Sequence, residues 1–428
     1  MNADAAVAQQ GSVRPAWRDP LAWAKAADVV AVLIALFLPW STSLAGIFIA
    51  IWLIAVAPTI APRAFLASLK QPICLLPVAL FALAVAGTLW SDAPWGARTY
   101  AILPTTKLLV LPLLFYRYQR SPRVMWVFTA FLVSCSLLMV MSWIVAFHPA
   151  WTMKATLETQ ERGIFVKNYI DQSQEFALCA VALAFPVITQ LRAGKKWPAL
   201  LLTALALSFV VNMAFVIVSR TALVTMPIML AVFAALHLKW RSIAIIACAG
   251  IVLAALAWTG SPQLRQTIGS FAGQYHLYRE QNAATSMGMR LEFWRKSLRF
   301  FAEAPVIGHG TGSTRGLFEQ AAIGQTGASA EIIGNPHNQT LNVAVQWGAA
   351  GIVVLYAMWL VHLLMFRGEG LIACVGLLVV VQNIFTSLFN SHLFDFHEGW
   401  MYVLGVGIAG GTLLGQGLRD AAPAGFAR

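Results

Sequence analysis

The chain has 428 residues, of which 59% are hydrophobic and only 11% are charged. Soluble globular proteins carry about 25% charged residues, so this composition excludes soluble, disordered and fibrous classes and predicts an all-α polytopic membrane protein. The net charge of +12 indicates basic loops that face anionic membrane lipid, and we expect no nucleic-acid partner.

Apolar windows of about 19 residues predict about 12 membrane-spanning helices. The predicted spans lie near residues 27–41, 43–58, 73–90, 101–116, 124–147, 175–191, 197–218, 221–238, 242–259, 338–366, 371–390 and 398–416. Eleven spans stay open as an alternative, because the break at Ser219–Arg220 can be a kink within one segment. We divide the chain into a bundle of nine spans over 1–259, an extramembrane loop over 260–337, and three spans with a tail over 338–428.

The distribution of lysine and arginine between alternate sides predicts the orientation. With the N-terminus in the cytoplasm, sixteen basic residues fall on that side and five fall in the short loops of the other side. The sixteen are Arg14, Arg18, Lys25, Arg63, Lys70, Arg117, Arg120, Arg123, Arg192, Lys195, Lys196, Lys239, Arg241, Arg367, Arg419 and Arg428, and the five are Arg98, Lys154, Arg162, Lys167 and Arg220. This positive-inside bias predicts cytoplasmic termini and places the 260–337 loop outside the cytoplasmic membrane.

The 260–337 loop contains two stretches in which apolar residues repeat at helical spacing. These residues are Leu264, Ile268, Phe271, Tyr275 and Tyr278 in the first stretch and Met287, Leu291, Trp294, Leu298 and Phe301 in the second. We predict two amphipathic helices that lie on the membrane or cap the bundle. Pro305 follows the second helix, and a glycine-rich turn follows over 308–312.

Common motifs of nucleotide-dependent and metal-dependent enzymes are absent from the sequence. It contains no GxxxxGK[ST], HExxH, CxxC or GxSxG pattern. Asp92, Asp171 and Asp395 are isolated along the chain, and no paired acidic motif is present in the outer loops. We therefore expect neither a metal nor another cofactor.

Basic residues of the outer side form the first candidate site. Arg220 lies between two long apolar runs, where an arginine is costly unless it faces a polar cavity or a bound anion; snorkelling at a span end is the alternative. Because a guanidinium binds phosphate oxygens through a planar fork, an arginine cluster can neutralise a diphosphate without a metal. The candidate diphosphate ligands are Arg98, Arg162, Lys167, Arg220, Arg265 and Arg290. For all but Arg220 and Arg290, a solvated surface position is the favoured interpretation.

The segment Gly-Asn-Pro-His-Asn-Gln-Thr-Leu at 334–341 joins the loop to a long span. We expect Asn335 to be the N-cap and Pro336 to take the first helical position. His337 then stands in the first turn, where the positive end of the helix dipole keeps its ring neutral and able to act as a general base. A histidine that only hydrogen-bonds at a helix start is the alternative. Spacing alone does not choose between His337 and the other outward histidines, which are His148, His276, His309, His392 and His397.

Four motifs, taken together in this order and spacing, resemble the O-antigen ligase/polymerase superfamily. They are Ser-Arg-Thr at 219–221, Met-Gly-Met-Arg-Leu-Glu-Phe-Trp at 287–294, Pro-Val-Ile-Gly-His-Gly-Thr-Gly-Ser at 305–313 and Pro-His-Asn-Gln-Thr-Leu at 336–341, with Gly348 behind them. The resemblance covers roughly residues 205–350 by motif. It implies a fold similar to the GT-C class of membrane glycosyltransferases.

The resemblance also implies substrates and a place of action. The implied donor is a glycan linked to undecaprenyl diphosphate, used on the periplasmic face of the bacterial inner membrane, and the acceptor of a ligase is a sugar hydroxyl of lipid A–core. By motif, the arginines of the family correspond to Arg220 and Arg290 and its histidine to His337, with Asn338 as a supporting residue. The lack of a larger extra periplasmic region favours a ligase over a protein O-oligosaccharyltransferase, while an O-antigen polymerase would use the same chemistry.

The expected reaction agrees with these residues. A diphosphate leaving group already activates the donor, so arginines need only stabilise its departure while His337 takes the proton of the acceptor hydroxyl. With one base and no covalent nucleophile, we expect a single displacement with inversion at the anomeric carbon. A flippase for lipid-linked oligosaccharides is the alternative from another class, and it would spread cations through the bilayer midplane. The pattern gives no role to His309 or Asp395, and Lys107 either snorkels outward or lines the lipid-diphosphate site.

Overall fold

The computed structural model describes residues 19–154, 156, 159 and 162–420, and every regular element among them is a helix. Through the first half of the chain the α-helices are α1 (Pro20–Phe37), α2 (Thr42–Val56), α3 (Pro62–Ser68), α4 (Pro72–Ala86), α5 (Trp95–Ile102), α6 (Val110–Tyr118), α7 (Val124–Phe147), α9 (Tyr169–Ala182), α10 (Ala184–Arg192) and α11 (Lys196–Phe215). They continue with α12 (Arg220–His237), α13 (Trp240–Gly260), α14 (Pro262–Gln281), α15 (Ser286–Glu303), α16 (Thr314–Ala322), α17 (Gln339–Met365), α18 (Leu371–Thr386) and α19 (Phe396–Asp420).

Ten of the described helical segments are long and apolar enough to cross a membrane. The α3–α4 pair is bent by 84° and adds one broken span or a re-entrant loop, while α18 is a shorter apolar helix. Each of the predicted spans therefore has a helical counterpart, and the prediction of an all-α polytopic membrane protein is confirmed. Of the basic residues used to predict the orientation, Arg14, Arg18 and Arg428 lie outside the described residues.

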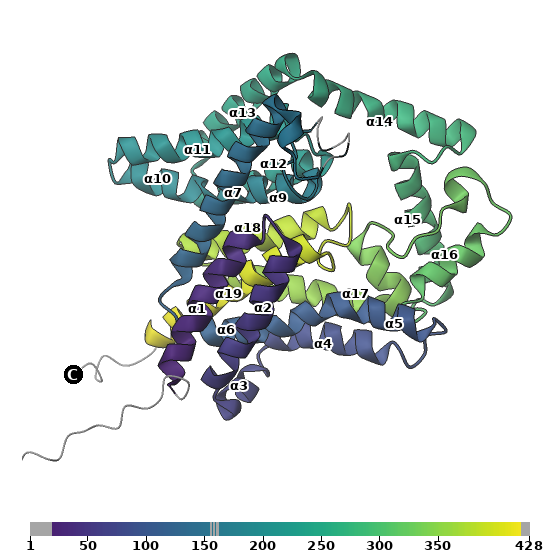
Figure 1. Ribbon diagram of the computed structural model, residues 1–428, viewed down its shortest axis with the longest axis horizontal. Helices are drawn as coiled ribbons and strands as arrows, with labels where there is room; N and C mark the ends of the chain where they lie inside the picture. Colours follow the sequence, from purple (N-terminus) through teal and green to yellow (C-terminus); the bar gives the residue numbers. More distant parts are fainter. Residues whose placement is uncertain (1–18, 155, 157–158, 160–161, 421–428) are drawn as a thin grey trace, which may run out of the picture.

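Both helices predicted in the 260–337 loop are present, as α14 and α15. In Figure 1, α14 extends from the end of α13 across to α15, and α15 and α16 stand beside α17. Phe293 and Phe300 of α15 pack with Phe318 of α16 and Val345 of α17 in a small apolar core of their own. This core fixes the loop helices on the start of α17.

A buried acid in the first span explains part of the packing of the bundle. Asp28 of α1 is completely buried, and its carboxylate lies 2.7 Å from Arg117 and 3.2 Å from Arg123. A charge in an apolar interior needs such partners because its lost hydration is costly. The two arginines therefore tie the end of α6 and the start of α7 to α1.

Helix α17 is interrupted at Gly348, whose φ of 61° and ψ of −154° are essentially restricted to glycine. The segment before the glycine-rich turn supplies the hydrogen bonds that the helix loses at this break. The amides of Ala349 and Ala350 donate to the carbonyls of Pro305 and Val306 at 2.8 and 3.1 Å. A Cβ on Gly348 would lie 2.5 Å from the Val306 carbonyl. The break thus accommodates the loop and sets the direction of the first half of α17.

We expect Gly348→Ala to destabilise the protein by roughly 1–3 kcal/mol from backbone strain, with a further cost from overlap with Val306. The measurement is the melting temperature in detergent micelles. Gly250→Ala is the matched control, because Gly250 lies inside helix α13 with nothing within 4 Å of its added Cβ. Equal melting temperatures for the two variants would contradict the proposed constraint.

Candidate functional site

The local structure at His337 differs from the predicted helix start. Asn338, and not Asn335, is the N-cap: its side chain accepts from the amide of Leu341 at 3.0 Å, and α17 begins at Gln339. The expectations that Pro336 takes the first helical position and that His337 stands in the first turn are therefore wrong. The physical reason is that His337 adopts a left-handed φ of 52°, which stops the helix from extending further towards the N-terminus.

His337 is half-buried and held by two asparagines. Its backbone amide donates to Oδ1 of Asn335 at 3.0 Å, and its ring Nδ1 lies 2.8 Å from Oδ1 of Asn390. Phe293 packs against the ring at a centroid distance of 6.1 Å. Burial lowers the pKa of His337; the hydrogen bond to Asn390 opposes this shift, and the charge of Arg290 adds to it. The ring is therefore neutral at pH 7, as a general base requires.

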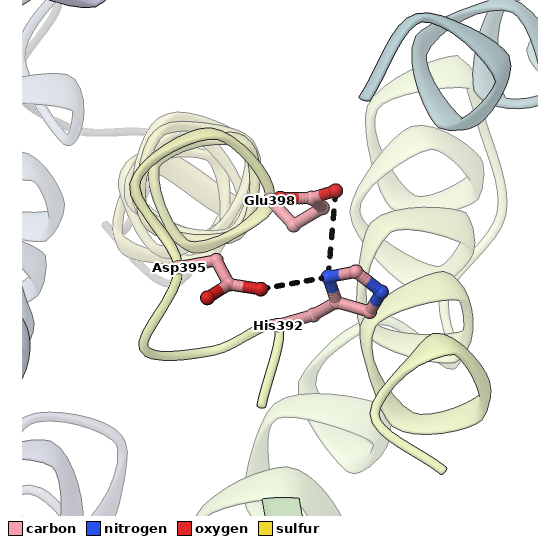
Figure 2. A group of neighbouring side chains, drawn as sticks. All are labelled: His392, Asp395 and Glu398. Carbon is pink, nitrogen blue, oxygen red and sulfur yellow. Dashed lines mark ion pairs between the residues drawn. The ribbon is translucent and has the colours of Figure 1, made fainter. Parts of the chain in front are cut away.

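The loop between α18 and α19 supplies the groups behind His337. Asn390 donates to Oδ2 of Asp395 at 2.6 Å, and Nδ1 of His392 lies 3.2 Å from Asp395 and 3.4 Å from Glu398. Figure 2 shows the His392 ring nitrogen between the two carboxylates. Burial disfavours the charged ring, but Glu398 and Asp395 outweigh this effect and raise the pKa of His392 to about 10. His392 is therefore an internal cation.

This cluster corrects the expectation that the acids are isolated. Asp395 contacts both Asn390 and His392, and Asp171 of α9 shares a hydrogen bond with Glu398. One ligand atom from each of His392, Asp395 and Glu398 lies within 4.8 Å of the others, which is close enough for a metal ion. The protonated imidazole already lies between the same two carboxylates and offsets one of their two negative charges, so the cluster is an ion-paired group.

Lys107 neither snorkels outward nor joins the arginines. It is buried, and its Nζ donates to the carbonyl of Phe394 at 3.0 Å and to that of Asp395. The lysine therefore anchors the backbone of the loop that carries the polar groups behind His337.

Three of the predicted cations gather around Tyr169, at the start of α9. The guanidinium of Arg162 lies over the Tyr169 ring at 4.2 Å, and Arg220 and Arg290 both interact electrostatically with Tyr169. Arg220 also interacts with the charges of Arg162 and Arg290, donates to Ser270 at 2.9 Å and lies over Phe271. Within the described part of the chain, no carboxylate forms an ion pair with Arg220 or Arg290. Like charges held together in this way favour an anion between them.

Arg98, Arg265 and Lys167 have other partners. Arg98 donates to the carbonyls of Thr88 and Ala93 at 2.9 and 2.6 Å. Arg265 donates to those of Trp258 and Thr259, both at 2.7 Å, and so caps the end of α13. Lys167 contacts His397 and the carbonyl of Leu38, and burial lowers its pKa while Glu175 opposes the shift. These three residues therefore contact backbone carbonyls or interact with carboxylates, and they do not join the Arg220–Arg290 group.

Sequence reasoning missed Tyr169, Asn390 and Glu398 as members of the site, and it named His392 only as one of the histidines that spacing does not separate from His337. A signal for Asn390, His392 and Glu398 was present. The stretch 389–398, Phe-Asn-Ser-His-Leu-Phe-Asp-Phe-His-Glu, concentrates six polar side chains between two apolar helices. Such a density of polar groups at a membrane boundary is costly unless the groups bond one another or a ligand.

Comparison with known proteins agrees with the motifs. Residues 205–356 match the protein-family model described as O-antigen ligase. This match, over about a third of the chain, agrees with the resemblance to the O-antigen ligase/polymerase superfamily. No curated protein matches the chain. The matched segment contains Arg220, Arg290, His337 and Gly348, whereas Asn390 and Asp395 lie beyond it.

The His392 ion pairs predict a pH dependence of stability. The ordinary pKa of histidine is about 6.5, and the pKa of about 10 in the folded protein means that folding binds the proton more tightly. The stabilisation is therefore complete below about pH 6.5 and is lost as the pH rises towards 10. The melting temperature of the wild type should fall more steeply over this window than that of His392→Gln, and parallel curves would contradict the charged state of His392.

Proposed function

We propose that the protein is an O-antigen ligase that transfers a glycan from undecaprenyl diphosphate to a sugar hydroxyl of lipid A–core. The observation that carries this proposal is the state of His337: Nδ1 is bonded to Asn390, while no described residue bonds to Nε2. The ring is half-buried, so Nε2 is available to a substrate. The Arg220–Arg290 group supplies the complementary site for an anion, and the charge of Arg290 also acts on His337.

In the proposed reaction Nε2 of His337 takes the proton of the acceptor hydroxyl as its oxygen bonds to the anomeric carbon of the donor. The bond from that carbon to the diphosphate oxygen breaks, and the electron pair leaves with undecaprenyl diphosphate. Arg220 and Arg290 stabilise the negative charge that develops there. Because one base acts and no carboxylate nucleophile takes part, the displacement inverts the anomeric configuration.

An O-antigen polymerase is the second candidate, since it needs the same base and the same cations but takes a second lipid-linked glycan as acceptor. The superfamily assignment includes it. Product analysis separates the two functions, because only a ligase attaches the glycan to lipid A–core.

We also propose that the protein lies in the bacterial inner membrane with both termini in the cytoplasm and the site facing the periplasm. The excess of basic residues on one side supports this orientation. A periplasmic site suits a reaction whose activated donor needs no ATP.

Cysteine labelling tests this orientation. In a background without the exposed Cys248, a membrane-impermeant thiol reagent should label Gln320→Cys in intact spheroplasts and should not label Lys195→Cys until the membrane is opened. Both positions are exposed, in α16 and before α11. Labelling of Lys195→Cys alone in intact spheroplasts would reverse the orientation.

The arginine variants test the anion site. Arg220→Ala and Arg290→Ala should each cost on the order of 2–5 kcal/mol of transition-state stabilisation, measured from kcat/KM for the lipid-linked donor. Arg→Lys should also be poor, because an ammonium cannot reproduce the planar fork. Arg315→Ala is the control, since Arg315 is exposed and pairs only with Glu319 at 2.9 Å. Lysine variants with wild-type kinetics would contradict the role of both arginines.

The decisive experiment uses purified protein, lipid A–core and undecaprenyl-diphosphate glycan in EDTA, without nucleotide. Ligated product is followed on a gel as a function of pH. Because burial lowers the pKa of His337 below its ordinary value, the rate should rise with pH below about 6.5 and be level at neutral pH. His337→Gln should lose on the order of 10²- to 10⁴-fold in kcat, since an amide donates a hydrogen bond but cannot take the proton.

His276→Gln is the matched control, because His276 is exposed and, among the described residues, contacts Glu280 and Tyr275 of its own helix. If His337→Gln kept most of the wild-type turnover, His337 would be a substrate-orienting residue and not the base. A requirement for an added divalent ion would show that the arginines alone do not stabilise the leaving group.

A further inference from the structure

His337 stands at one end of a hydrogen-bonded chain that runs through Asn335 and Asn390 to Asp395. Each asparagine amide has one accepting oxygen and one donating nitrogen, so the orientation of each is decided by its partners. The ends of this chain are groups whose roles are fixed. One is a backbone amide, which only donates, and the other is a carboxylate, which only accepts.

The donating end fixes Asn335. The backbone amide of His337 donates to Oδ1 of Asn335 at 3.0 Å, and the hydroxyl of Ser391 donates to the same oxygen at 2.7 Å. The amide nitrogen of Asn335 therefore points the other way, towards Asn390 at 3.1 Å. The atom of Asn390 that receives this hydrogen bond has to be its oxygen.

The accepting end requires the same orientation of Asn390. Its amide nitrogen lies 2.6 Å from Oδ2 of Asp395, and a carboxylate oxygen can only accept. Both ends of the chain thus turn Oδ1 of Asn390 towards Nδ1 of His337, at 2.8 Å. Since that oxygen cannot donate, the proton of the neutral imidazole has to be on Nδ1.

We propose that Asn390 and Asp395 are positioning residues that keep the His337 proton on Nδ1 and so leave Nε2 as the atom that accepts the proton of the acceptor hydroxyl. This inference rests on the proposed role of His337 as base and adds the residues that make the base competent. Neither residue touches the reacting atoms. Asp395 acts through Asn390, in the way that a carboxylate orients a catalytic imidazole directly in other enzymes.

Neighbouring residues hold the hydrogen-bonded asparagines and Asp395 in this orientation. The cation His392 and the anchor Lys107 both contact Asp395, through its carboxylate and its backbone carbonyl respectively. Asn342 of α17 donates to Ser391 at 3.1 Å and so fixes the loop next to Asn390. Lys107, Asn342, Ser391 and His392 are buried, whereas Asn335, Asn390 and Asp395 are partly exposed. A reversed Asn390 amide would lose its hydrogen bonds to Asn335 and Asp395, which is costly.

Charges that face His337 come from two elements. Arg290 of α15 lowers the pKa of His337 and Asp395 of the α18–α19 loop raises it, while His392 of the same loop lowers it. Removing the carboxylate charge while keeping its oxygen therefore changes the pKa of His337 without changing the hydrogen-bond chain. This difference separates positioning by Asp395 from a merely structural role.

The test compares Asp395→Asn with Asp395→Ala. Asparagine at 395 can still accept from Asn390, so His337 should keep its proton on Nδ1 and most of its activity, while the acidic limb of the pH–rate profile moves to lower pH. Alanine at 395 removes one of the two groups that orient Asn390, and only the hydrogen bond from Asn335 still turns Oδ1 of Asn390 towards Nδ1. Part of the His337 population should then carry its proton on Nε2, and kcat should fall in proportion to that share. Asp92→Asn is the control, because Asp92 is an exposed acid that takes no part in the hydrogen bonds among Asn335, Asn390 and Asp395.

The tautomer is read directly from ¹⁵N NMR spectra of histidine-labelled protein in nanodiscs, with His337→Gln identifying the signal of His337. Wild type and Asp395→Asn should carry the proton on Nδ1, and Asp395→Ala should show an added population with the proton on Nε2. If the melting temperature shows that Asp395→Ala is unfolded, Asn390→Ala provides the same measurement, because it removes the acceptor itself.

Two results would overturn the inference: a wild-type His337 protonated on Nε2, or an Asp395→Asn profile that coincides with that of the wild type and of Asp92→Asn. The NMR result does not depend on turnover, so it also separates this inference from the proposed function. A tautomer that responds to Asp395→Ala, combined with full activity of His337→Gln, would support the positioning chain and exclude His337 as the base.

Discussion

The attachment of the amino end of α17 to the loop between α18 and α19 is the constraint on which the site depends. The amide of Gln339 donates to the carbonyl of Ser387 at 2.8 Å, the side chain of Asn338 donates to that of Leu388 at 3.2 Å, and the amide of Leu393 donates back to the side chain of Gln339 at 3.1 Å. These bonds join two segments about 50 residues apart in sequence. They bring His337, which belongs to the start of one helix, against Asn390, which belongs to the loop before another, and none of the polar chain would exist without them.

The charged groups of the site form two sets that differ in how they are balanced. The carboxylates of Asp395 and Glu398 have partners inside the protein, namely His392 and, for Asp395, a hydrogen bond from Asn390. Arg220 and Arg290 have no carboxylate partner among the described residues. A protein interior has a low dielectric, so a matched group is stable by itself while an unmatched one gains most from a bound ion. The paired carboxylates therefore suit the support of a base, and the unpaired arginines suit the binding of an anionic substrate.

Backbone conformations at two positions hold this arrangement. The left-handed φ of His337 turns its amide towards Asn335, and the glycine-only conformation of Gly348 lets the 305–310 segment bond to the interrupted helix. Strained residues of this kind persist when the surrounding contacts compensate for their cost, and they concentrate at functional sites. Here the contacts come from α15 and α16, which cover the start of α17 through the Phe293–Phe300–Phe318 core.

The sequence by itself determined the class of protein, the helices and a family resemblance. Composition and long apolar runs depend only on local content, so the spans and the two helices of the 260–337 loop could be predicted from the sequence. The motifs around Arg220, Arg290, His337 and Gly348 resemble the superfamily whose model matches residues 205–356. Only the tertiary structure decided which cations share a site and what stands behind His337. A sequence does not show what a basic side chain contacts. Arg98 and Arg265 bind backbone carbonyls, whereas Arg220 and Arg290 interact with each other. Asp395 is isolated along the chain and becomes part of the site only because folding brings the loop after α18 against α17, and hydrogen bonds between distant segments leave no periodic trace in the sequence.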